Sequence, residues 1–421
     1  MAQLSDDCFA FGGELMTVAA ALELLRARTV ALPGSEPAPL AEAAGRILAA
    51  DITAPRDVPP HDNSAVDGYA VFHADLAADG ETVLPVGGRA AAGHPLGRPA
   101  RRGEAIRIFT GAPMPEGPDT VMMQEDCIAE DGGARVRLRP GLKPGANRRR
   151  AGEDVRTGSV VLHAGSRLRA QEIGLAASLG FTALPVYRRL RVALLSTGDE
   201  VREPGTTPLP PGAIYDANRY ALGVLLRGLG CAVTDLGIRP DRLDAIRDAL
   251  ADAAAGHDLV MTSGGMSTGE EDHVKAAIEA QGSLHFWRLA IKPGRPVALG
   301  QIGRVPFMGL PGNPVAVMVT FLVLARPLLL RLAGAAEARP WTYPVAAGFE
   351  HRKKQGRREY LRVRLEADGR GGWVARKFPR DGAGILTSMV ESDGLAVLDE
   401  SVTGLAIGDP VAFLPFREVM D

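Results

Sequence analysis

Lysine and cysteine are scarce in this chain of 421 residues: six of its 48 basic residues are lysine, and three residues are cysteine. Cys8, Cys127 and Cys231 are widely separated and lack metal-ligand spacing, which argues against a disulfide framework and against a zinc site. Each lysine is informative because its compact, flexible charge suits an oxyanion. The low cysteine content fits a reducing compartment, and we expect a cytoplasmic protein.

An excess of either charge is also missing. The formal net charge is −2, whereas nucleic-acid surfaces and electrostatically anchored membrane proteins carry a basic excess. The first 13 residues lack the cationic flank and long apolar core of a signal peptide. The most apolar stretch, 314–332, is interrupted by Arg326 and Pro327 before it could span a bilayer. We therefore expect a buried helix there, and neither a nucleic-acid nor a membrane partner.

The length suggests about three domains of roughly 150 residues each. Short runs rich in glycine and proline dominate residues 56–149 and predict a small inserted β domain. Residues 334–421 alternate short strands with glycine turns and predict a C-terminal, barrel-like β domain. The remaining predicted domains are a connector, 30–55 and 150–186, and an α/β domain, 10–29 and 187–333.

Residues 187–333 alternate predicted strands with predicted helices. The strands are expected at 191–197, 231–238 and 258–262, and the helices at 218–229, 241–255 and 271–281, with Asp241 as the N-cap of the second helix. This order is typical of a doubly wound, mostly parallel sheet with helices on both faces. Ligands of such sheets bind at the carboxyl ends of the strands. The residues expected to converge on one crevice are Glu200, Asp241, 263–272 and the turn after Met308.

Residues 262–275, with the sequence TSGGMSTGEEDHVK, carry the most chemical information. Ser263, Gly264 and Gly265 follow a buried strand, and glycines let backbone N–H groups approach a phosphate. The acidic residues that follow, up to Asp272, either cap the next helix or share a divalent cation with the phosphate. The residues alone leave both interpretations open.

Other motifs have both a structural and a functional interpretation. Lys275, and Lys292 in IKPG, either bind an oxyanion or lie solvated on the surface. The segment LPGNP, residues 310–314, is ordinary chemistry for the start of a helix unless the amides of its turn face an anion. Asp67 and Thr110 each precede a glycine, which is typical of a hairpin turn.

Eight motifs occur in one order along nearly the whole chain. They are PPHDNSAVDGYAV, RIFTGAPMPEGPDTVMMQE, NRRRAGEDV, VALLSTGDE, GAIYDANRY, DLVMTSGGMSTGEEDHVK, FWRLAIKPGRP and GLPGNPVAV. This set resembles the molybdopterin molybdotransferases, also called molybdopterin molybdenumtransferases, a family that includes the bacterial MoeA proteins and the E domain of gephyrin. The resemblance implies an α/β multidomain fold with a doubly wound molybdopterin-binding domain and the inserted, connector and C-terminal domains described above.

The resemblance also implies a reaction, the last step of molybdenum cofactor synthesis. The enzyme would take adenylylated molybdopterin and molybdate, cleave the pyrophosphate link with help from Mg²⁺, and release AMP with the metal held on the dithiolene. Breaking a phosphoanhydride needs charge neutralisation and positioning, which carboxylates and cations supply. The family is expected to form homodimers whose site is shared between subunits. Molybdopterin adenylyltransferase and molybdoenzyme chaperones are further expected partners.

Site residues are implied by their motif positions. The implied catalytic residues are Asp67, Thr110, Asp154, Glu200, Asp241 and Asp272, of which Asp241 and Asp272 would also hold Mg²⁺. The implied substrate-binding residues are Ser263, Gly264, Gly265, Lys275, Lys292, Arg295, Pro311, Asn313, Arg357 and Ser388. Among these, Ser263 to Gly265 would hold phosphate, and the basic side chains would hold molybdate or phosphate.

The chain departs from the family pattern at two positions. Arg295 stands where the family usually has the second lysine of KPGKP, and Ala316 stands where it often has the serine of PGNPVS. Arginine keeps the charge but changes the donor geometry, and alanine removes a hydroxyl donor. These positions bear on oxyanion affinity and on the choice between molybdate and tungstate.

Two other functions compete with this hypothesis. The adenylyltransferase that makes the adenylylated intermediate has a similar doubly wound domain, but it usually has that domain alone, so the two predicted β domains argue against it. A dimeric scaffolding module, as gephyrin is at synapses, is the non-enzymatic alternative. No appended partner domain is recognised in this sequence, which favours the enzyme.

Overall fold

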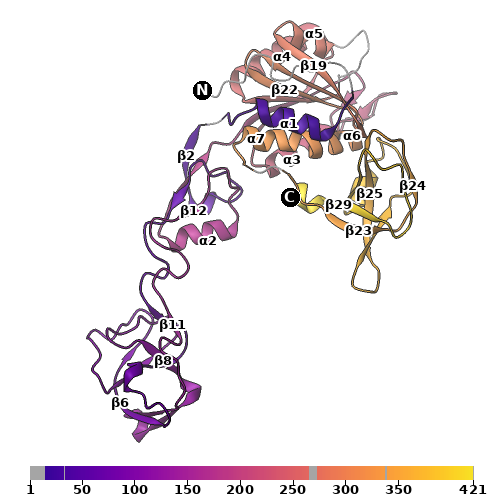
Figure 1. The fold of residues 1–421 in the computed structure, drawn as a ribbon. Coiled ribbons are helices and arrows are strands. Elements are labelled where there is room, and N and C mark those ends of the chain that lie inside the picture. The colour runs from indigo at the N-terminus through magenta and orange to yellow at the C-terminus, as the bar shows by residue number, and fades with distance from the viewer. Residues whose placement is uncertain (1–14, 33, 265–272, 337–338, 421) are drawn as a thin grey trace. The chain divides into compact units, whose positions relative to one another are not determined.

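The computed structural model describes residues 15–32, 34–264, 273–336 and 339–420. The chain divides into two compact units. Figure 1 colours the chain by residue number, so the segments of each unit can be traced in it. The first unit comprises the chain up to Ala50, Ala164–Arg169 and the chain from Ala183 onward, and the second comprises Asp51–His163 and Ala170–Thr182. The predicted connector segments, 30–55 and 150–186, therefore contribute residues to both units.

Among the described residues, seven strands form the central sheet of the first unit, in the order β1-β19-β21-β22-β18-β14-β17. Their bounds are β1 (Leu15–Met16), β14 (Arg191–Thr197), β17 (Ala232–Arg239), β18 (Leu259–Ser263), β19 (Gly282–Leu289), β21 (Pro296–Ile302) and β22 (Val305–Leu310). Strands β22, β18, β14 and β17 are parallel neighbours, whereas β21 runs antiparallel to β19 and β22. The connection from β21 to β22 is too short for parallel strands, which need a crossover of about a dozen residues or more. The sheet is mixed, with its parallel part where the sequence predicts it.

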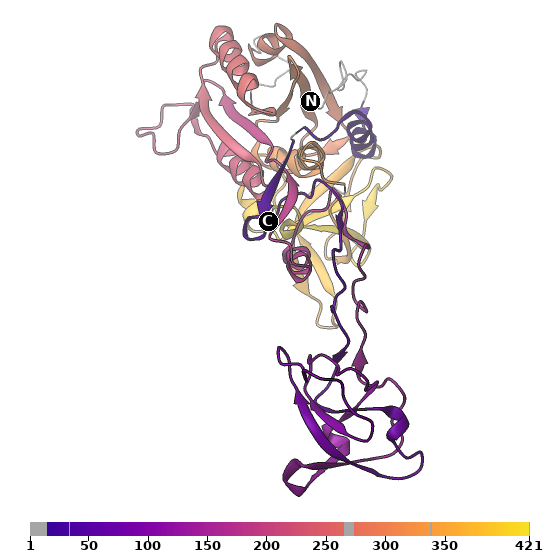
Figure 2. The same cartoon turned by 90° about the vertical axis from the view of Figure 1, so that its left-hand side faces the viewer.

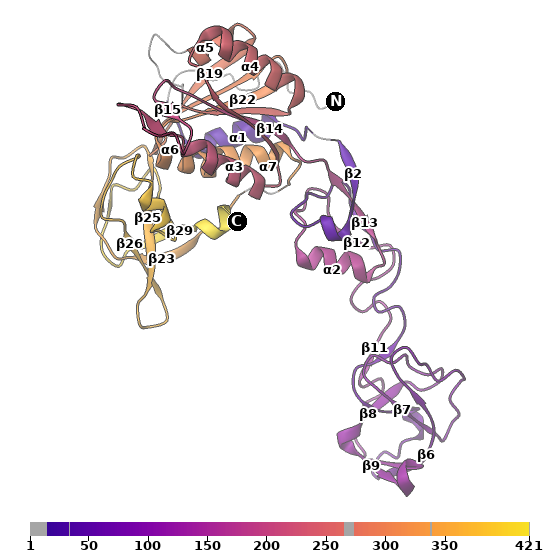
Figure 3. The same ribbon diagram turned by 180° about the vertical axis from the view of Figure 1, so that it is seen from behind.

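Helices cover both faces of this sheet, as the order of elements predicts (Figure 3). One face carries α1 (Val18–Arg28), α3 (Asn218–Gly228), α6 (Pro314–Thr320), η5 (Phe321–Ala325) and α7 (Arg326–Leu332), and the other carries α4 (Leu243–Gly256) and α5 (His273–Glu279). Strand β14 shows the cause, because successive side chains of a strand point to opposite faces. Val192 and Leu194 pack in the first core, and Ala193 and Leu195 pack in the second.

The helical run from Pro314 to Leu332 is the one described helix that is long and apolar enough to cross a membrane by length and composition. In the fold, 89% of its most apolar window is buried. Val315, Phe321 and Leu329 pack in the core on one face of the central sheet. The predicted buried helix is confirmed.

A closed barrel follows the α/β domain, as predicted. Its strands are β25 (Arg358–Ala367), β26 (Trp373–Lys377), β23 (Tyr343–Ala347), β29 (Pro410–Pro415) and β27 (Gly394–Leu398). Strand β27 pairs back onto β25 and closes the barrel, around an interior that includes Leu361, Val363 and Phe413. A short strand, β20 (Ile291–Lys292), leaves the α/β domain and pairs in parallel with β25.

The second unit contains a sheet of six described strands in the order β8-β5-β7-β6-β10-β9. This unit is drawn in purple in Figure 2. Their bounds are β5 (Gly68–Val71), β6 (Thr82–Ala90), β7 (Ala105–Ile108), β8 (Thr120–Met123), β9 (Cys127–Glu130) and β10 (Arg135–Leu138). Tyr69 and Val136 belong to one small core of this unit, and Ile106 and Val121 belong to another. The sequence interval 56–149 of the predicted inserted domain lies within this unit.

Short strand pairs complete the fold. In the first unit β2 (Ser35–Pro39) pairs with β13 (Ala183–Tyr187), β15 (Val201–Arg202) with β16 (Ile214–Tyr215), and β24 (His351–Arg352) with β28 (Gly404–Leu405). In the second unit β3 (Ile52–Thr53) pairs with β12 (Val160–Leu162) and β4 (Asn63–Ser64) with β11 (Arg148–Arg149), and α2 (Ala170–Ser178) follows. The remaining short helices are η1 (Leu40–Glu42), η2 (His73–Asp75), η3 (Gln124–Asp126), η4 (Asp131–Gly133), α8 (Thr387–Val390) and α9 (Phe416–Val419).

Candidate functional site

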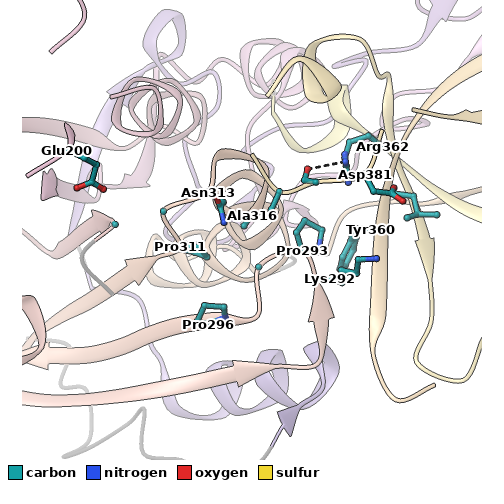
Figure 4. A pocket seen from close by; sticks show the side chains of 16 residues that line it. Glu200, Lys292, Pro293, Pro296, Pro311, Asn313, Ala316, Tyr360, Arg362 and Asp381 are labelled. Atoms are coloured by element: carbon teal, nitrogen blue, oxygen red, sulfur yellow. Dashed lines mark hydrogen bonds between the residues drawn. The ribbon is translucent and has the colours of Figure 1, made fainter. Parts of the chain in front are cut away.

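A cavity of about 510 Å³ lies where the carboxyl edge of the parallel strands meets the barrel (Figure 4). The residues that line it are Glu200, Gly264, Lys292, Pro293, Gly294, Pro296, Pro311, Gly312, Asn313, Ala316, Tyr360, Leu361, Arg362, Asp381, Gly382 and Ala383. Glu200 lies on one side of the cavity, and Arg362 and Asp381 lie on the other. The predicted convergence at the carboxyl edge thus brings together residues from three strand ends, and the barrel adds a wall.

Glu200 reaches the cavity from the turn that follows β14. Gly198, in that turn, has φ +133°, which lies in the left-handed region that favours glycine. A Cβ atom at this position would lie 2.7 Å from Glu200 Oε2. The backbone therefore requires the glycine of the STGDE segment, and a side chain there would also displace the carboxylate that folds back over it.

Small residues at the end of β18 lie against the turn that follows β22. Ser263 is buried, and its hydroxyl donates to the carbonyl oxygen of Pro311 at 3.3 Å. Gly264 has φ +82°, lines the cavity, and donates its N–H to the carbonyl of Leu310 at 3.3 Å. In this arrangement the Ser263 hydroxyl proton is engaged, so Ser263 offers a ligand its oxygen as an acceptor. Gly265 lies outside the described residues.

The turn after β22 forms the floor of the cavity through Pro311, Gly312 and Asn313. Asn313 is the N-cap residue of α6, without a side-chain capping bond, and Pro314 occupies the first turn as the sequence predicts. The N–H of Val315 donates to the carbonyl of Ala383 in the barrel at 2.9 Å. This main-chain hydrogen bond ties the first turn of α6 to the loop that follows β26.

Lys292 lines the cavity beside a buried carboxylate. Glu359 is completely buried, and its Oε2 lies 3.8 Å from Lys292 Nζ and 2.9 Å from His351 Nε2. Its Oε1 accepts from Arg357 Nε at 2.9 Å. Burial alone would raise the pKa of Glu359, but the His351 hydrogen bond and the charges of Lys292 and Arg357 outweigh it and lower that pKa. Glu359 therefore stays ionised; it fixes Arg357 by a hydrogen bond and places a negative charge beside Lys292.

Arg362 and Asp381, which the sequence did not predict, lie on the side of the cavity opposite Glu200. Arg362 is buried, and its Nε donates to Ser388 Oγ at 3.0 Å. Its Nη2 donates to the carbonyls of Arg380 and Gly382 at 3.4 and 3.3 Å. Burial lowers the pKa of the Arg362 guanidinium, and the charge of Asp381 opposes that shift. Ser388, a predicted substrate-binding residue, is fully buried and orients Arg362 instead of lining the cavity.

Three other predicted residues lie near this edge without lining the cavity. Arg295 is exposed and precedes β21, and Lys275 is exposed on α5. Asp241 follows β17 at the carboxyl edge, but the prediction that it caps the next helix is wrong. Helix α4 begins at Leu243, and Arg242 occupies the N-cap position without a side-chain capping bond. Asp272, the second predicted magnesium ligand, lies outside the described residues.

The remaining predicted catalytic residues belong to the second unit. The N–H and the hydroxyl of Thr110 both donate to Asp67 Oδ1 at 2.8 Å. These two hydrogen bonds, followed by the charge of Arg107, lower the pKa of Asp67. Asp154 is exposed, and its N–H donates to the carbonyl of Val58 at 3.1 Å. Asp67 is thus an ionised, partly buried carboxylate fixed by Thr110.

Comparison with known proteins agrees with this architecture. Residues 16–180 match the MoeA N-terminal region (domain I and II), residues 193–331 match a probable molybdopterin binding domain, and residues 344–416 match the MoeA C-terminal region (domain IV). A crystal structure of the molybdopterin biosynthesis moeA protein from Pyrococcus horikoshii is similar, with a TM-score of 0.82 and 30% sequence identity. The match covers 96% of this chain and 100% of that one. The fold is that of a multidomain protein of the MoeA type.

Curated relatives extend the agreement over most of the sequence. A molybdopterin molybdenumtransferase from Haemophilus influenzae is 41% identical over 383 residues, which cover 90% of this chain and 94% of the relative. Molybdopterin molybdenumtransferase 2 from Mycobacterium tuberculosis is 36% identical and covers 88% of this chain and 92% of its own. The chain belongs to the MoeA family, as its motifs indicate.

The buried charge of Glu359 predicts a pH-dependent stability. Replacing Glu359 by Gln should cost about 1.5–3 kcal/mol at neutral pH, because it removes the charged acceptor of the hydrogen bonds with His351 and Arg357. The native pKa lies below the ordinary value of 4.5, so this stabilisation is present above about pH 4.5 and is lost as the pH falls through the native pKa. Denaturant unfolding at pH 7 and at successively lower pH should show the difference between the two proteins shrinking.

The matched control is Glu366→Gln, which breaks an exposed ion pair with Arg376 on the same barrel. This change should cost less than about 1 kcal/mol at any pH. An equal cost for Glu359→Gln and Glu366→Gln at neutral pH would contradict the role given to the buried charge.

Proposed function

We propose that this protein is a molybdopterin molybdenumtransferase that inserts molybdenum from molybdate into adenylylated molybdopterin and releases AMP. One observation carries the proposal: cations from the α/β domain and from the barrel line a single cavity, opposite a carboxylate, at the edge of the parallel sheet. Lys292, Arg362 and Glu200 are these residues. Such an arrangement suits a reaction in which an oxyanion and a phosphoanhydride must bind at the same site.

Lys292 and Arg362 are proposed to bind molybdate. The side chain of Lys292 is about half exposed, at 48%, so its ammonium group can turn toward an anion. The guanidinium of Arg362 is buried, and in the described ranges it forms no ion pair; its contacts there are with a hydroxyl and two carbonyl groups. A buried cation of this kind interacts strongly with an anion because water screens it little. The charge of Asp381 limits the total positive charge of this wall.

The phosphate of the substrate is proposed to bind at the floor of the cavity. Gly264 and Gly312 line it and have no side chain to exclude a ligand. Asn313 contributes an amide that can donate or accept. Glu200 faces this floor from the α/β domain, where a carboxylate can accept a proton as the phosphoanhydride is hydrolysed. We therefore propose Glu200 as a catalytic residue.

Mg²⁺ is proposed to assist, and the donor chemistry of Asp241 fits it. Mg²⁺ prefers oxygen ligands and is commonly held by one or two carboxylates together with the phosphates of the substrate. Within the ranges that the structure describes, no three His, Cys, Asp or Glu side chains gather as a ready-made metal site. Asp241 would supply one carboxylate, with Asp272 as the proposed second. When bound, the ion would neutralise charge on the phosphoanhydride.

Partners of the proposed reaction follow from its substrates. An adenylylating enzyme must supply the adenylylated pterin, and an acceptor must take up the finished cofactor. We therefore propose molybdopterin adenylyltransferase and molybdoenzyme chaperones as partners, in the cytoplasm where the reduced dithiolene would persist.

The function is tested by incubating the purified chain with adenylylated molybdopterin, molybdate and Mg²⁺ and measuring AMP. The protein should release AMP, and Asp241→Ala should slow release by about two orders of magnitude or more, because metal-held charge stabilisation is worth several kcal/mol. The control is Asp252→Ala, which removes an exposed carboxylate from α4 and should leave the rate unchanged. Turnover of the Asp241 variant at the normal rate would refute its role, and ATP-dependent adenylylation of molybdopterin would favour the adenylyltransferase.

The oxyanion site is tested separately by Lys292→Gln. Losing a hydrogen bond to a charged group costs about 1.5–3 kcal/mol, so molybdate should bind about 10- to 100-fold more weakly. Calorimetric titration with molybdate in the absence of pterin measures this directly. Lys354→Gln, which removes an exposed lysine of the C-terminal region outside the cavity lining, should bind molybdate like the unmodified protein, and equal binding by both variants would remove Lys292 from the site.

The protein is proposed to act as a homodimer, because the predicted catalytic carboxylates divide between two units. Asp67 and Asp154 belong to the second unit, and Glu200 and Asp241 belong to the first. If the complete site needs both units from different subunits, only the dimer will be active. Light scattering coupled to the AMP assay should find activity in a species of about twice the 44.3 kDa chain mass. A fully active monomer would contradict this proposal.

A further inference from the structure

Arg219, in the first turn of α3, binds acidic side chains from three separate segments. It is 4% exposed. Its Nε lies 3.0 Å from Asp216 Oδ2, its Nη2 lies 2.5 Å from Glu203 Oε1, and its Nη1 pairs with Asp235. Desolvation would lower the pKa of Arg219, but its hydrogen bonds to Asp235 and Asp216 outweigh that and raise it. The side chain does not line the cavity, so its role is not direct contact with a ligand there.

Two of the three acids mark the ends of one small ribbon. Strands β15 and β16 pair with each other; Glu203 follows β15 and Asp216 follows β16. Glu200 immediately precedes β15, and its carbonyl accepts a hydrogen bond from the N–H of Ile214 in β16 at 2.8 Å. Arg219 therefore binds an acid at the end of each strand of the β15–β16 ribbon. This ribbon begins next to Glu200, the catalytic residue proposed above.

Asp235, the third acid, connects Arg219 to the central sheet. Asp235 lies in β17, the edge strand beside β14. The residue before Arg219 adds a second tie, because Asn218 Nδ2 donates to the carbonyl of Gly312 at 2.7 Å. Gly312 belongs to the floor of the cavity. Two adjacent residues of α3 thus hold the Glu200 ribbon and the cavity floor relative to one helix.

Electrostatics make the arrangement depend on a single cation. The three carboxylates outnumber Arg219, and Asp216 is itself 4% exposed. Without the guanidinium the three like charges would repel one another, and Asp216 would lose the partner that offsets its desolvation. The ribbon is the part that can move away, because Glu203 is about half exposed, at 47%. Loss of Arg219 should therefore displace the segment that carries Glu200.

We propose that Arg219 is a positioning residue for the transferase reaction: by clamping the β15–β16 ribbon to α3 and β17, it holds the Glu200 carboxylate at the cavity. The proposal rests on the proposed function through Glu200. It predicts that Arg219 and Glu200 act as one unit, so that removing either abolishes the same contribution.

The test uses the full chain with Arg219→Met, alone and combined with Glu200→Gln. Arg219→Met should lower kcat for AMP release about tenfold or more and leave calorimetric binding of molybdate unchanged, because Lys292 and Arg362 lie on the other side of the cavity. The double variant should be no slower than Glu200→Gln alone, within about twofold. Trypsin should also cleave after Arg202, inside the ribbon, faster in Arg219→Met than in the unmodified protein.

Arg191→Met is the matched control. Arg191 pairs with Asp258 at 2.8 Å, at the opposite, amino end of the parallel strands β14 and β18. Its loss should leave kcat and cleavage after Arg202 unchanged. If Arg219→Met does not fold, Glu203→Gln releases one strand of the ribbon with less disruption, and it should show the same fast cleavage and the same coupling to Glu200→Gln.

The outcomes separate this proposal from the proposed function. Unchanged kcat in Arg219→Met would overturn the positioning role. So would a double variant whose loss of kcat is the product of the two single losses. Normal resistance of Arg219→Met to trypsin would overturn it as well. A Glu200→Gln protein with full activity would also overturn it, since no carboxylate would then need holding. If the unmodified protein releases no AMP while Arg219→Met is still cleaved faster, the clamp exists and the transferase proposal is the one that fails.

Discussion

The short pairing between β20 and β25 is the constraint on which the candidate site depends. Ile291 and Lys292 pair with Arg358 and Glu359, and this register sets Lys292 beside the fully buried Glu359. A buried carboxylate is tolerated because His351 and Arg357 also bind it. The wall that joins the α/β domain to the barrel is thus held by main-chain hydrogen bonds and by a neutralised charge, and the cavity lies against this wall.

In this arrangement the scarce lysine and the abundant arginines differ in mobility, and this difference suits them to different roles. Lys292 is half exposed, with a flexible stem, so its charge can follow an anion through a reaction. Arg362 and Arg357 are fixed by hydrogen bonds to Ser388 and Glu359 respectively. In the proposed site, the fixed guanidinium of Arg362 would give the anion pocket its shape, and the flexible Lys292 would adapt to the ligand. Arg295, which replaces a family lysine, is exposed and outside the cavity lining, so its altered donor geometry bears less on the oxyanion than its motif suggested.

Sequence reasoning succeeded where the site follows from topology alone. Parallel strands share a carboxyl edge, so the residues after β14, β18 and β22 had to meet once the strand order was known. Glu200, Gly264 and Asn313 line one cavity for that reason. The barrel wall could not be predicted in this way. Arg362 alternates with Leu361 and Val363, which fill the barrel, and such alternation ordinarily indicates a solvent-facing side chain.

The same limit applies to Asp241 and to the clamp at Arg219. A polar residue before a helical pattern favours an N-cap. Helix α4 nevertheless begins at Leu243, so Asp241 lies in the short segment between the end of β17 and the helix. Arg219 is one of many arginines on predicted helices, where a solvated side chain is the ordinary expectation. Only the tertiary fold brings Glu203 and Asp235 to it.

Burying the charge of Arg219 has a cost in free energy, and an apolar side chain of similar size would often leave the fold as stable or more stable. Stability alone therefore does not explain why an arginine is buried there. Such a network fixes geometry, because each of the three carboxylates accepts from a different nitrogen of one rigid guanidinium group. Its position beside the ribbon of Glu200, and next to Asn218, which holds the cavity floor, is where such specificity affects chemistry. The energetic cost of the buried charges is therefore best explained by the placement of Glu200, the carboxylate that we propose to be catalytic.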